Sequence, residues 1–451
     1  MTDTILNGLE SRAPITNTAA WIDNLEEDSR RALVALGELL VGAADRPRPE
    51  TATAFTERCL GVDSSRKLID EDIVLSGVQA LTYALALAEL ITEHSAETGP
   101  SEHLDPPSWT QTPVGETVYH HPAALRASFP AGTMLPDVAS VIQIRTKRAY
   151  GQDPEITVYV RREHQAQARN VLDRISERAN ELHPYRGRAV RACMRMGLVL
   201  EVITLPAGLT RDTVVVDESV WREIDLGLKA VRDQHEMLNR HGLGCRRGIL
   251  LVGPPGTGKS ALSAVVANEV VGAFTAIYVE ARAGTNLLTA VIEEAQRFGG
   301  GPVLIVLEDV DLWCRDRSAG GGAGLSELLQ AMDIQADARI LTLASTNDSS
   351  TLDKAAIRTG RFDSIVEVGY PDRTAAEVIL ATLVSGIPGG DTVDTTTVAG
   401  RLPDRTSGSD LREIVRRAVL SGDGEVSTAA LVAEIGSGRY RAQAPSGGQY
   451  L

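Results

Sequence analysis

The most regular pattern in this sequence is a series of short apolar runs in its second half, each followed by polar or charged residues. The runs are Ile249-Leu250-Leu251-Val252, Val303-Leu304-Ile305-Val306-Leu307 and Ile340-Leu341-Thr342-Leu343-Ala344. Strands that are buried on both faces have this composition, and helical patterns lie between the runs. From about residue 218 onward, the alternation therefore predicts a parallel sheet with covering helices.

The first half of the chain has a different pattern. Trp21 to Val41 places its apolar residues near one helical face, and Val74 to Ile91 is apolar nearly all round, which is typical of a buried helix. Gly99-Pro100, Pro106-Pro107 and Pro113 predict a linker before residue 118. A small α+β module is predicted after it. Its expected strands are 138–145, 156–160, 198–203 and 214–216, and its expected helix is 163–182.

A glycine-rich segment directly follows the first apolar run. Its residues are Gly253, Pro254, Pro255, Gly256, Thr257, Gly258, Lys259 and Ser260, and a helical pattern continues from Ala261. This order of strand, loop and helix predicts a phosphate-binding loop, because the glycines let consecutive backbone N–H groups surround phosphate oxygens. Lys259 supplies a positive charge for the β- and γ-phosphates, and Ser260 a hydroxyl for Mg²⁺. We therefore expect a nucleoside triphosphate site, with ATP and Mg²⁺ as cofactors.

Polar side chains end the other two apolar runs. Glu308 and Asp309 follow the run at 303–307, and Asn347 follows the strand pattern at 340–346. The carboxyl ends of parallel strands meet at one edge of the sheet, where ligands bind in open α/β sheets. One carboxylate is expected to hold Mg²⁺, and the other, together with Asn347, to orient the attacking water.

With Arg358-Thr359-Gly360-Arg361-Phe362-Asp363 and Thr406-Ser407-Gly408-Ser409-Asp410-Leu411, these motifs resemble those of the AAA family of ring-forming ATPases. The resemblance covers about residues 218–437. It implies a hexamer in which Arg361 reaches the nucleotide of a neighbouring subunit, and it places Ser409 near the nucleotide. An arginine supplied in trans contributes on the order of 10³–10⁵ in rate, so activity is expected to require the ring.

Three positions depart from the family's pattern. The acids stand in the reverse of the usual order, so the resemblance implies that Glu308 takes the metal position and Asp309 the water-orienting position. This order is similar to that of the mitochondrial translocase branch that inserts the Rieske iron–sulfur protein. Ser364 stands where many members have a second finger arginine. The segment from Tyr278 to Asn286 offers no aromatic tip for a pore loop, and Tyr278 fits a core strand as well as a pore.

The last four residues, Gly448-Gln449-Tyr450-Leu451, resemble the terminus with which actinobacterial proteasomal ATPases dock on the 20S proteasome core. A tyrosine, an apolar leucine and a free carboxylate can fill a pocket between subunits. Several tails on one ring raise the effective concentration for docking. Gln449, Tyr450 and Leu451 are thus the predicted docking residues, and a disordered end without a partner is the alternative.

Composition narrows the function classes further. The net charge of −15 argues against a general nucleic-acid or anionic-membrane surface. The four cysteines lie far apart and no HExxH pattern occurs, so no zinc site is predicted. No apolar stretch is long enough to span a bilayer, and the start lacks a signal-type core. A cytoplasmic protein is expected.

The predicted fold class is α/β: a P-loop NTPase parallel sheet with a C-terminal helical lid, preceded by a helical N-terminal region and a small α+β module. The predicted parts are a helical region at 1–97, a linker at 98–117, the α+β module at 118–217, the ATPase subdomain at 218–373, the lid at 374–437 and a tail at 438–451. The expected function is a ring ATPase that remodels proteins and docks on a 20S core. A stand-alone remodeller and a nucleotide-gated scaffold with low turnover stay open.

Overall fold

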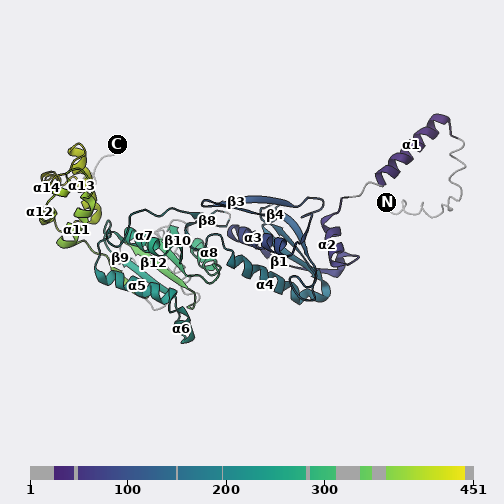
Figure 1. The fold of residues 1–451 in the computed structure, drawn as a ribbon, viewed down its shortest axis with the longest axis horizontal. Helices are drawn as coiled ribbons and strands as arrows, with labels where there is room; N and C mark the ends of the chain where they lie inside the picture. Colours follow the sequence, from purple (N-terminus) through teal and green to yellow (C-terminus); the bar gives the residue numbers. More distant parts are fainter. Residues whose placement is uncertain are drawn as a thin grey trace, which may run out of the picture.

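The computed structural model describes residues 25–44, 49–148, 151–195, 197–280, 285–310, 336–347 and 362–441. After the helix α1 (Glu27–Ala44), the chain forms an N-terminal domain, a second sheet with its covering helices, and a helical lid, which follow one another along the long axis (Figure 1). Within this described part of the chain, no helix is long and apolar enough to cross a membrane.

The N-terminal domain is built on a six-stranded antiparallel sheet of order β1-β6-β5-β4-β2, in which β3 also pairs with β4. Its strands are β1 (Leu68–Val74), β2 (Glu97–Gly99), β3 (Ser108–Val114), β4 (Thr117–Phe129), β5 (Ser140–Arg145) and β6 (Glu155–Arg161). Its helices are α2 (Ala52–Leu60), α3 (Gly77–Glu93) and α4 (Gln165–Glu181), with 3₁₀ turns at Ser65–Lys67 and Arg162–His164. Apolar residues of α3 and α4 pack on one face of the sheet, and Phe55 and Leu60 of α2 pack on Val141 of the other.

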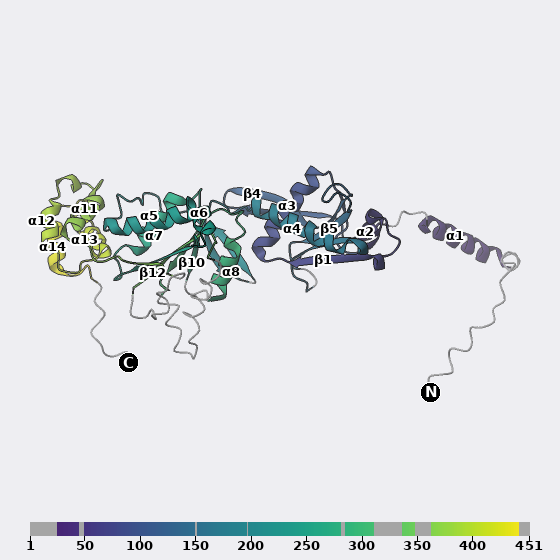
Figure 2. The same cartoon turned by 90° about the horizontal axis from the view of Figure 1, so that it is seen from below.

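The second sheet has seven strands in the order β13-β9-β12-β11-β10-β7-β8. They are β7 (Ala189–Met194), β8 (Leu198–Val202), β9 (Arg247–Val252), β10 (Thr275–Glu280), β11 (Val303–Glu308), β12 (Ile340–Thr346) and β13 (Ser364–Glu367). Its helices are α5 (Glu218–Arg232), α6 (His235–Arg240), α7 (Lys259–Val270) and α8 (Thr285–Ala295). Figure 2 shows α5 and α7 on one face of this sheet and α8 on the other, so the central strands are buried on both faces.

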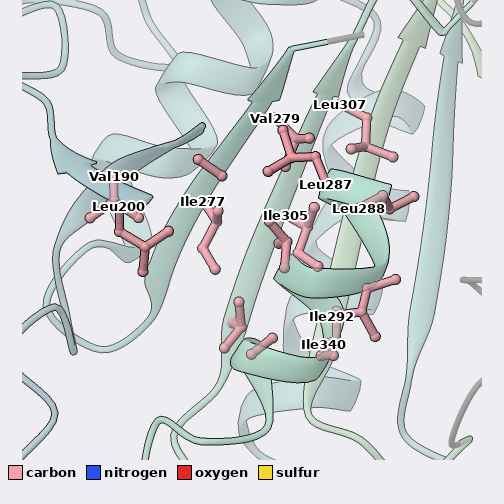
Figure 3. Close-up of a cluster of buried hydrophobic side chains, with 14 of the residues drawn as sticks. Val190, Leu200, Ile277, Val279, Leu287, Leu288, Ile292, Ile305, Leu307 and Ile340 are labelled. Atoms are coloured by element: carbon pink, nitrogen blue, oxygen red, sulfur yellow. The ribbon is translucent and has the colours of Figure 1, made fainter. Parts of the chain in front are cut away.

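Strands β7 and β8 extend this sheet beyond β10. β7 pairs in parallel with β10, and β8 returns antiparallel to β7. Val190 of β7 and Leu200 of β8 join Ile277 of β10 and the apolar side of α8 in one core (Figure 3). The same core includes Val78 and Val114, so the N-terminal domain packs directly against the second sheet.

Polar contacts also join these two domains. Arg188 donates hydrogen bonds to the carbonyl oxygen of Val114 (2.6 Å) and to Oγ1 of Thr117 (3.2 Å), at the turn between β3 and β4. Nε2 of His183, the residue after the C-cap of α4, lies 3.0 Å from Oε1 of Glu294 on α8. Both side chains of that pair are buried, and the imidazole packs against Phe298 with ring centroids 4.1 Å apart.

The lid consists of short helices around a small apolar core that includes Leu380, Leu411 and Leu431. They are α11 (Arg373–Val384), α12 (Thr395–Gly400), α13 (Gly408–Ser421) and α14 (Thr428–Ser437), with a 3₁₀ turn at Gly390–Thr392. At the start of each of these four helices, the N-cap side chain accepts a hydrogen bond from a backbone N–H group of the first turn. Ser407 and Asp410, for example, form a reciprocal capping box at the start of α13.

The predicted fold class is confirmed, whereas several predicted boundaries in the first half differ from the structure. The linker expected at 98–117 contains β3, and the region expected to be helical up to 97 contains β1. The strand expected at 198–203 is β8, which belongs to the second sheet rather than to the α+β module. No strand forms at 214–216: the segment has no regular pairing with the strands that the structure describes, and Val214 and Val215 instead line a cavity.

Candidate functional site

The predicted phosphate loop connects β9 to α7. Gly256 (φ +79°) and Gly258 (φ +102°) have left-handed backbone conformations that favour glycine. A Cβ atom on Gly256 would lie 2.0 Å from Oγ of Ser409, so the loop and the lid leave no room for a side chain there. Gly258 is the N-cap of α7 and provides no capping side chain, unlike the N-caps of α5, α11 and α13. The first-turn N–H groups of α7 are therefore arranged to bind an anion.

Lys259, the first residue of α7, is buried within this loop. Its Nζ donates hydrogen bonds to the carbonyl oxygens of Gly253 (2.7 Å) and Pro254 (2.8 Å). Oγ1 of Thr257 donates to the same carbonyl of Pro254 at 3.0 Å. The ammonium group thus lies on the inner side of the loop, where a phosphate chain held by the backbone N–H groups would meet it. The loop fits the phosphates of a nucleotide in both shape and charge.

The two acids at the end of β11 line two different cavities. Glu308 faces α7 and lines a cavity of about 430 Å³ together with Ser260, Tyr278 and Glu280. Asp309 has a left-handed backbone (φ +50°), which is uncommon for a residue other than glycine and often occurs at functional sites. This conformation brings Asp309 into the cavity that contains the phosphate loop. Ser260 lines both cavities, so it stands between the two carboxylates.

Asn347, at the end of β12, lies beside Asp309. Its Nδ2 donates a hydrogen bond to Oδ1 of Asp309 at 3.1 Å. Ser345 lines the same cavity, and its Oγ accepts a hydrogen bond from the backbone N–H of Asp309 at 3.4 Å. Adjacent strands of the parallel sheet deliver these groups, as the sequence predicted for its carboxyl edge. A carboxylate next to an amide can orient and polarise a water molecule, and Glu308 with the Ser260 hydroxyl offers oxygen ligands that suit Mg²⁺.

The cavity at the phosphate loop, called here the phosphate-loop cavity, has a volume of about 390 Å³. The lid closes one side through Gly408, Ser409 and Arg412 of α13, and the backbone N–H of Ser409 donates to the carbonyl oxygen of Gly256 at 3.1 Å. A further part of the lining, called here the apolar wall, is mostly apolar. It consists of Leu209, Thr213, Val214, Val215, Ile379, Thr382 and Leu383. A cavity that combines a phosphate loop with an apolar wall fits a nucleotide.

Tyr278 lies in β10 and does not belong to a loop. It pairs with Val306 of β11, and its hydroxyl is buried without a hydrogen-bond partner among the described residues. Burial, with the nearby negative charge of Glu308, raises the pKa of Tyr278 to about 12. Of the two interpretations from the sequence, the strand position agrees with the structure.

Other predicted site residues lie outside the described residues. These are the proposed finger Arg361, the neighbouring Arg358, and the docking residues Gln449, Tyr450 and Leu451. The structure brings together the remaining predicted residues, namely the loop from Gly253 to Ala261, both acids, Asn347 and Ser409.

The sequence analysis missed the apolar wall and Arg412. The wall is assembled from residues about 170 positions apart, and no local pattern marks them. Arg412 follows Ser409 by three positions in a helix, a spacing that places both on one face. That spacing is the signal by which Arg412 could have been found.

Comparison with known families supports this geometry. Residues 249–370 match the model of the "ATPase family associated with various cellular activities (AAA)". The match begins in β9, includes the phosphate loop, Glu308, Asp309 and Asn347, and ends before α11.

Individual relatives are similar over part of the chain. The "ATP-dependent zinc metalloprotease FtsH" of Cupriavidus metallidurans is 36% identical over 188 residues, which are 39% of this chain and 28% of that protein. "FtsH 4" of Sphaerobacter thermophilus is 37% identical over 196 residues, or 40% of this chain and 29% of that protein. The FtsH of Marinobacter nauticus is 34% identical over 226 residues, which are 47% of this chain and 35% of that protein. The chain therefore spans about a third or less of the length of these relatives.

Proposed function

Because residues 249–370 match the AAA ATPase family, we propose that this chain assembles into a hexameric ring and uses ATP hydrolysis to remodel a protein substrate. The observation that carries the proposal is that the phosphate loop, Asp309, Asn347 and the lid residue Ser409 line one cavity. The lid contacts the loop directly, so a change in the bound nucleotide can move the lid. Movement of this kind is how nucleotide binding is coupled to work on a partner.

In this proposal each group has a defined role. Residues 253–261 bind the phosphates, with Lys259 as the mobile cation. Ser260 and Glu308 would hold Mg²⁺, which would supply positive charge beside the phosphate oxygens. Asp309 and Asn347 orient the attacking water, and Arg361 serves the site of the neighbouring subunit. The placement of Glu308 and Asp309 in separate cavities supports this division of roles despite the reversed order of the acids.

Steady-state ATP hydrolysis tests the proposal, with Lys259→Ala and Asp309→Asn beside the wild-type chain. Lys259→Ala is expected to lose nucleotide binding. Asp309→Asn is expected to bind ATP but to hydrolyse it at least about 100-fold more slowly, since the group that orients water is lost. Unchanged turnover in both variants would refute the assignment of these residues.

A second candidate function is a nucleotide-gated scaffold with low turnover. It is favoured by Asp309, whose side chain is one methylene shorter than the glutamate usual in the family at the water-orienting position. Tight ATP binding by a wild-type ring without measurable release of phosphate would support this candidate over the remodelling ATPase.

We also propose that the tail residues Gln449, Tyr450 and Leu451 dock the ring on a 20S proteasome core. The support is the terminal sequence alone. The test is the peptidase activity of an actinobacterial 20S core with the full-length ring and with a variant lacking the three residues. Stimulation that disappears on truncation supports docking, whereas neither stimulation nor binding would leave a stand-alone remodeller. A cytoplasmic location is part of the proposal, and the free thiols Cys59, Cys193 and Cys245 fit a reducing compartment.

A further inference from the structure

The apolar wall of the phosphate-loop cavity depends on a segment without helix or strand, residues 204–216, called here the base-side segment. Its residues Leu209, Thr213, Val214 and Val215 line the phosphate-loop cavity. An apolar wall in a cavity that also contains a phosphate loop suits the base of a nucleotide. A segment with no regular backbone pairing needs other contacts to hold it in place.

We propose that Arg211 is a positioning residue that holds the base-side segment against α5 and α7, and thereby sets the affinity of the site for the base of its nucleotide. This inference rests on the proposed ATPase function. Arg211 does not line the cavity itself, so it acts through the neighbouring residues Leu209, Thr213 and Val214.

Arg211 bridges two helices through paired hydrogen bonds. Its Nη1 and Nη2 donate to Oδ2 and Oδ1 of Asp225 on α5, at 2.9 and 2.6 Å. Its Nε and Nη2 donate to Oε1 and Oε2 of Glu269 on α7, both at 2.8 Å. The guanidinium carbon also lies 4.6 Å from the ring centroid of Trp221 on α5. Only the planar fork of an arginine can make two paired contacts and stack on a ring at once.

Charge and local turns support the same anchor. The hydrogen bonds to Asp225 and Glu269 raise the pKa of Arg211, and the hydrogen bond from Arg211 lowers the pKa of Asp225, so the cation stays charged at neutral pH. Around Arg211 the chain makes a compact turn. Oγ1 of Thr213 accepts a hydrogen bond from the backbone N–H of Thr210 (2.9 Å) and donates to its carbonyl oxygen (2.9 Å).

A second contact comes from the residue next to Glu269. Nδ2 of Asn268 donates to the carbonyl oxygen of Pro206 at 3.0 Å. Asn268 and Glu269 lie near the C-terminal end of α7, and the phosphate loop enters the N-terminal end of the same helix at Lys259. Ten residues of helix separate Lys259 from Glu269, about 15 Å. One rigid element therefore sets the distance between the phosphate loop and the base-side segment.

The experiment compares Arg211→Met with Arg222→Met in the full-length protein. Arg222 is a matched control, because it lies on α5, pairs with Glu218 at 3.7 Å in an exposed ion pair, and is not among the described residues that line the cavity. Equilibrium dissociation constants are measured for ATP and for UTP, which share the phosphates and differ in the base, together with kcat and KM for ATP.

Arg211→Met is expected to weaken ATP binding roughly fivefold, as expected for the loss of a networked ion pair, and to raise KM with kcat little changed. UTP binding should change less than about twofold, so that discrimination between the two bases shrinks. Arg222→Met should leave both constants unchanged. Arg211→Lys should behave much like Arg211→Met, because an ammonium lacks the planar fork that makes paired contacts with both carboxylates and stacks on Trp221.

Equal weakening of ATP and UTP by Arg211→Met, or no weakening of either, would overturn the inference, as would a wild-type protein that does not distinguish the two bases. If Arg211→Met does not fold, Asp225→Asn keeps the test open, since it removes one of the two paired contacts and should shift the ratio in the same direction. A wild-type chain that binds no nucleotide would instead remove the proposed function.

Discussion

Asn347 donates a hydrogen bond to Asp309 at 3.1 Å, although 38 residues separate the two in the sequence. The contact joins the ends of two adjacent strands of the parallel sheet. It holds the Asp309 carboxylate in one orientation, which matters because Asp309 leaves the strand with a left-handed backbone. The water-orienting role proposed for Asp309 needs such a constraint, since a small displacement of a catalytic acid costs a large factor in rate.

Replacing Asn347 with Ala is therefore expected to lower kcat for ATP hydrolysis by about tenfold to 100-fold, with little change in the dissociation constant for ATP. Turnover and equilibrium binding measured on the same preparation separate the two effects. Loss of binding with kcat unchanged would show that the amide contacts the nucleotide and does not position Asp309.

Arg412 offers a second prediction. It lines the phosphate-loop cavity and makes no hydrogen bond or ion pair with any residue that the structure describes, whereas Arg416 and Arg417 of the same helix pair with Glu413 and Glu434. Arg412→Met is expected to weaken ATP binding about tenfold, because a cation facing the phosphates is lost. Arg412→Lys should keep most of the affinity.

Arg416→Met is the control for Arg412, since it removes an arginine one turn further along α13 and away from the cavity. Titration of a fluorescent ATP analogue checks all three variants. Equal affinities for Arg412→Met and Arg416→Met would exclude a contact between Arg412 and the nucleotide.

Because the phosphate loop and the lid lie so close together, we expect a methyl group added at Gly256 to weaken nucleotide binding strongly. In Gly256→Ala, the new Cβ would meet Oγ of Ser409 at 2.0 Å, in addition to the strain of a left-handed backbone. Nucleotide affinity is expected to fall at least about tenfold, with a loss of stability of about 1–3 kcal/mol. Gly272→Ala has a comparable φ of +97° but no atom within 4 Å of the added Cβ, so it reports the strain alone.

Isothermal titration and thermal unfolding of both glycine variants provide the comparison. If Gly272→Ala weakens nucleotide binding as much as Gly256→Ala does, the loss comes from general destabilisation and the contact with Ser409 has no specific role.

The buried pair between the two sheet domains leads to a prediction about stability. His183→Ala leaves the carboxylate of Glu294, only 4% exposed, without its imidazole partner and removes the packing on Phe298. A cost of about 3 kcal/mol in the free energy of unfolding is expected. Arg195→Ala removes a shorter ion pair, 2.7 Å from Glu201, whose side chains are 69% and 43% exposed, and should cost less than about 1 kcal/mol.

Urea unfolding of the two variants shows whether the burial of an ion pair or the shortness of its N–O distance determines how much the pair stabilises the protein. Similar midpoints for both would mean that the interface between the domains contributes little to the cooperative unit.

The parts of the fold that could be predicted are those with a local cause. Strands β9, β11 and β12 are buried on both faces, so their sequences are continuously apolar and could be recognised. Strand β3 could not, because its sequence Ser-Trp-Thr-Gln-Thr-Pro-Val is polar and contains Pro113, and only its pairing with β4 makes it a strand. Residues 214–216 have strand composition but no strand partner, and they were predicted wrongly.

The same distinction applies to the site. The phosphate loop was predictable because its glycines, Lys259 and Ser260 are adjacent in the sequence and act through their own backbone. The apolar wall was not, because Leu209 and Ile379 meet only after three parts of the chain pack together. Arg211 likewise has its role through Asp225 and Glu269, which are 14 and 58 residues away.

The pairing of β7 with β10 decides where a stable fragment of this protein can start. A recombinant ATPase fragment that began at Glu218, the start of α5, would lack β7 and β8. The N–H and C=O groups of β10 that pair with β7 would then have no hydrogen-bond partner on that edge. Ile277 and Val279, which pack in the same core as the missing β7 and β8, would be exposed beside them. An open, apolar strand edge of this kind promotes association with other chains. Recombinant fragments should therefore begin before Ala189, since a boundary set by the family match alone would remove β7 and β8 and select the aggregating form.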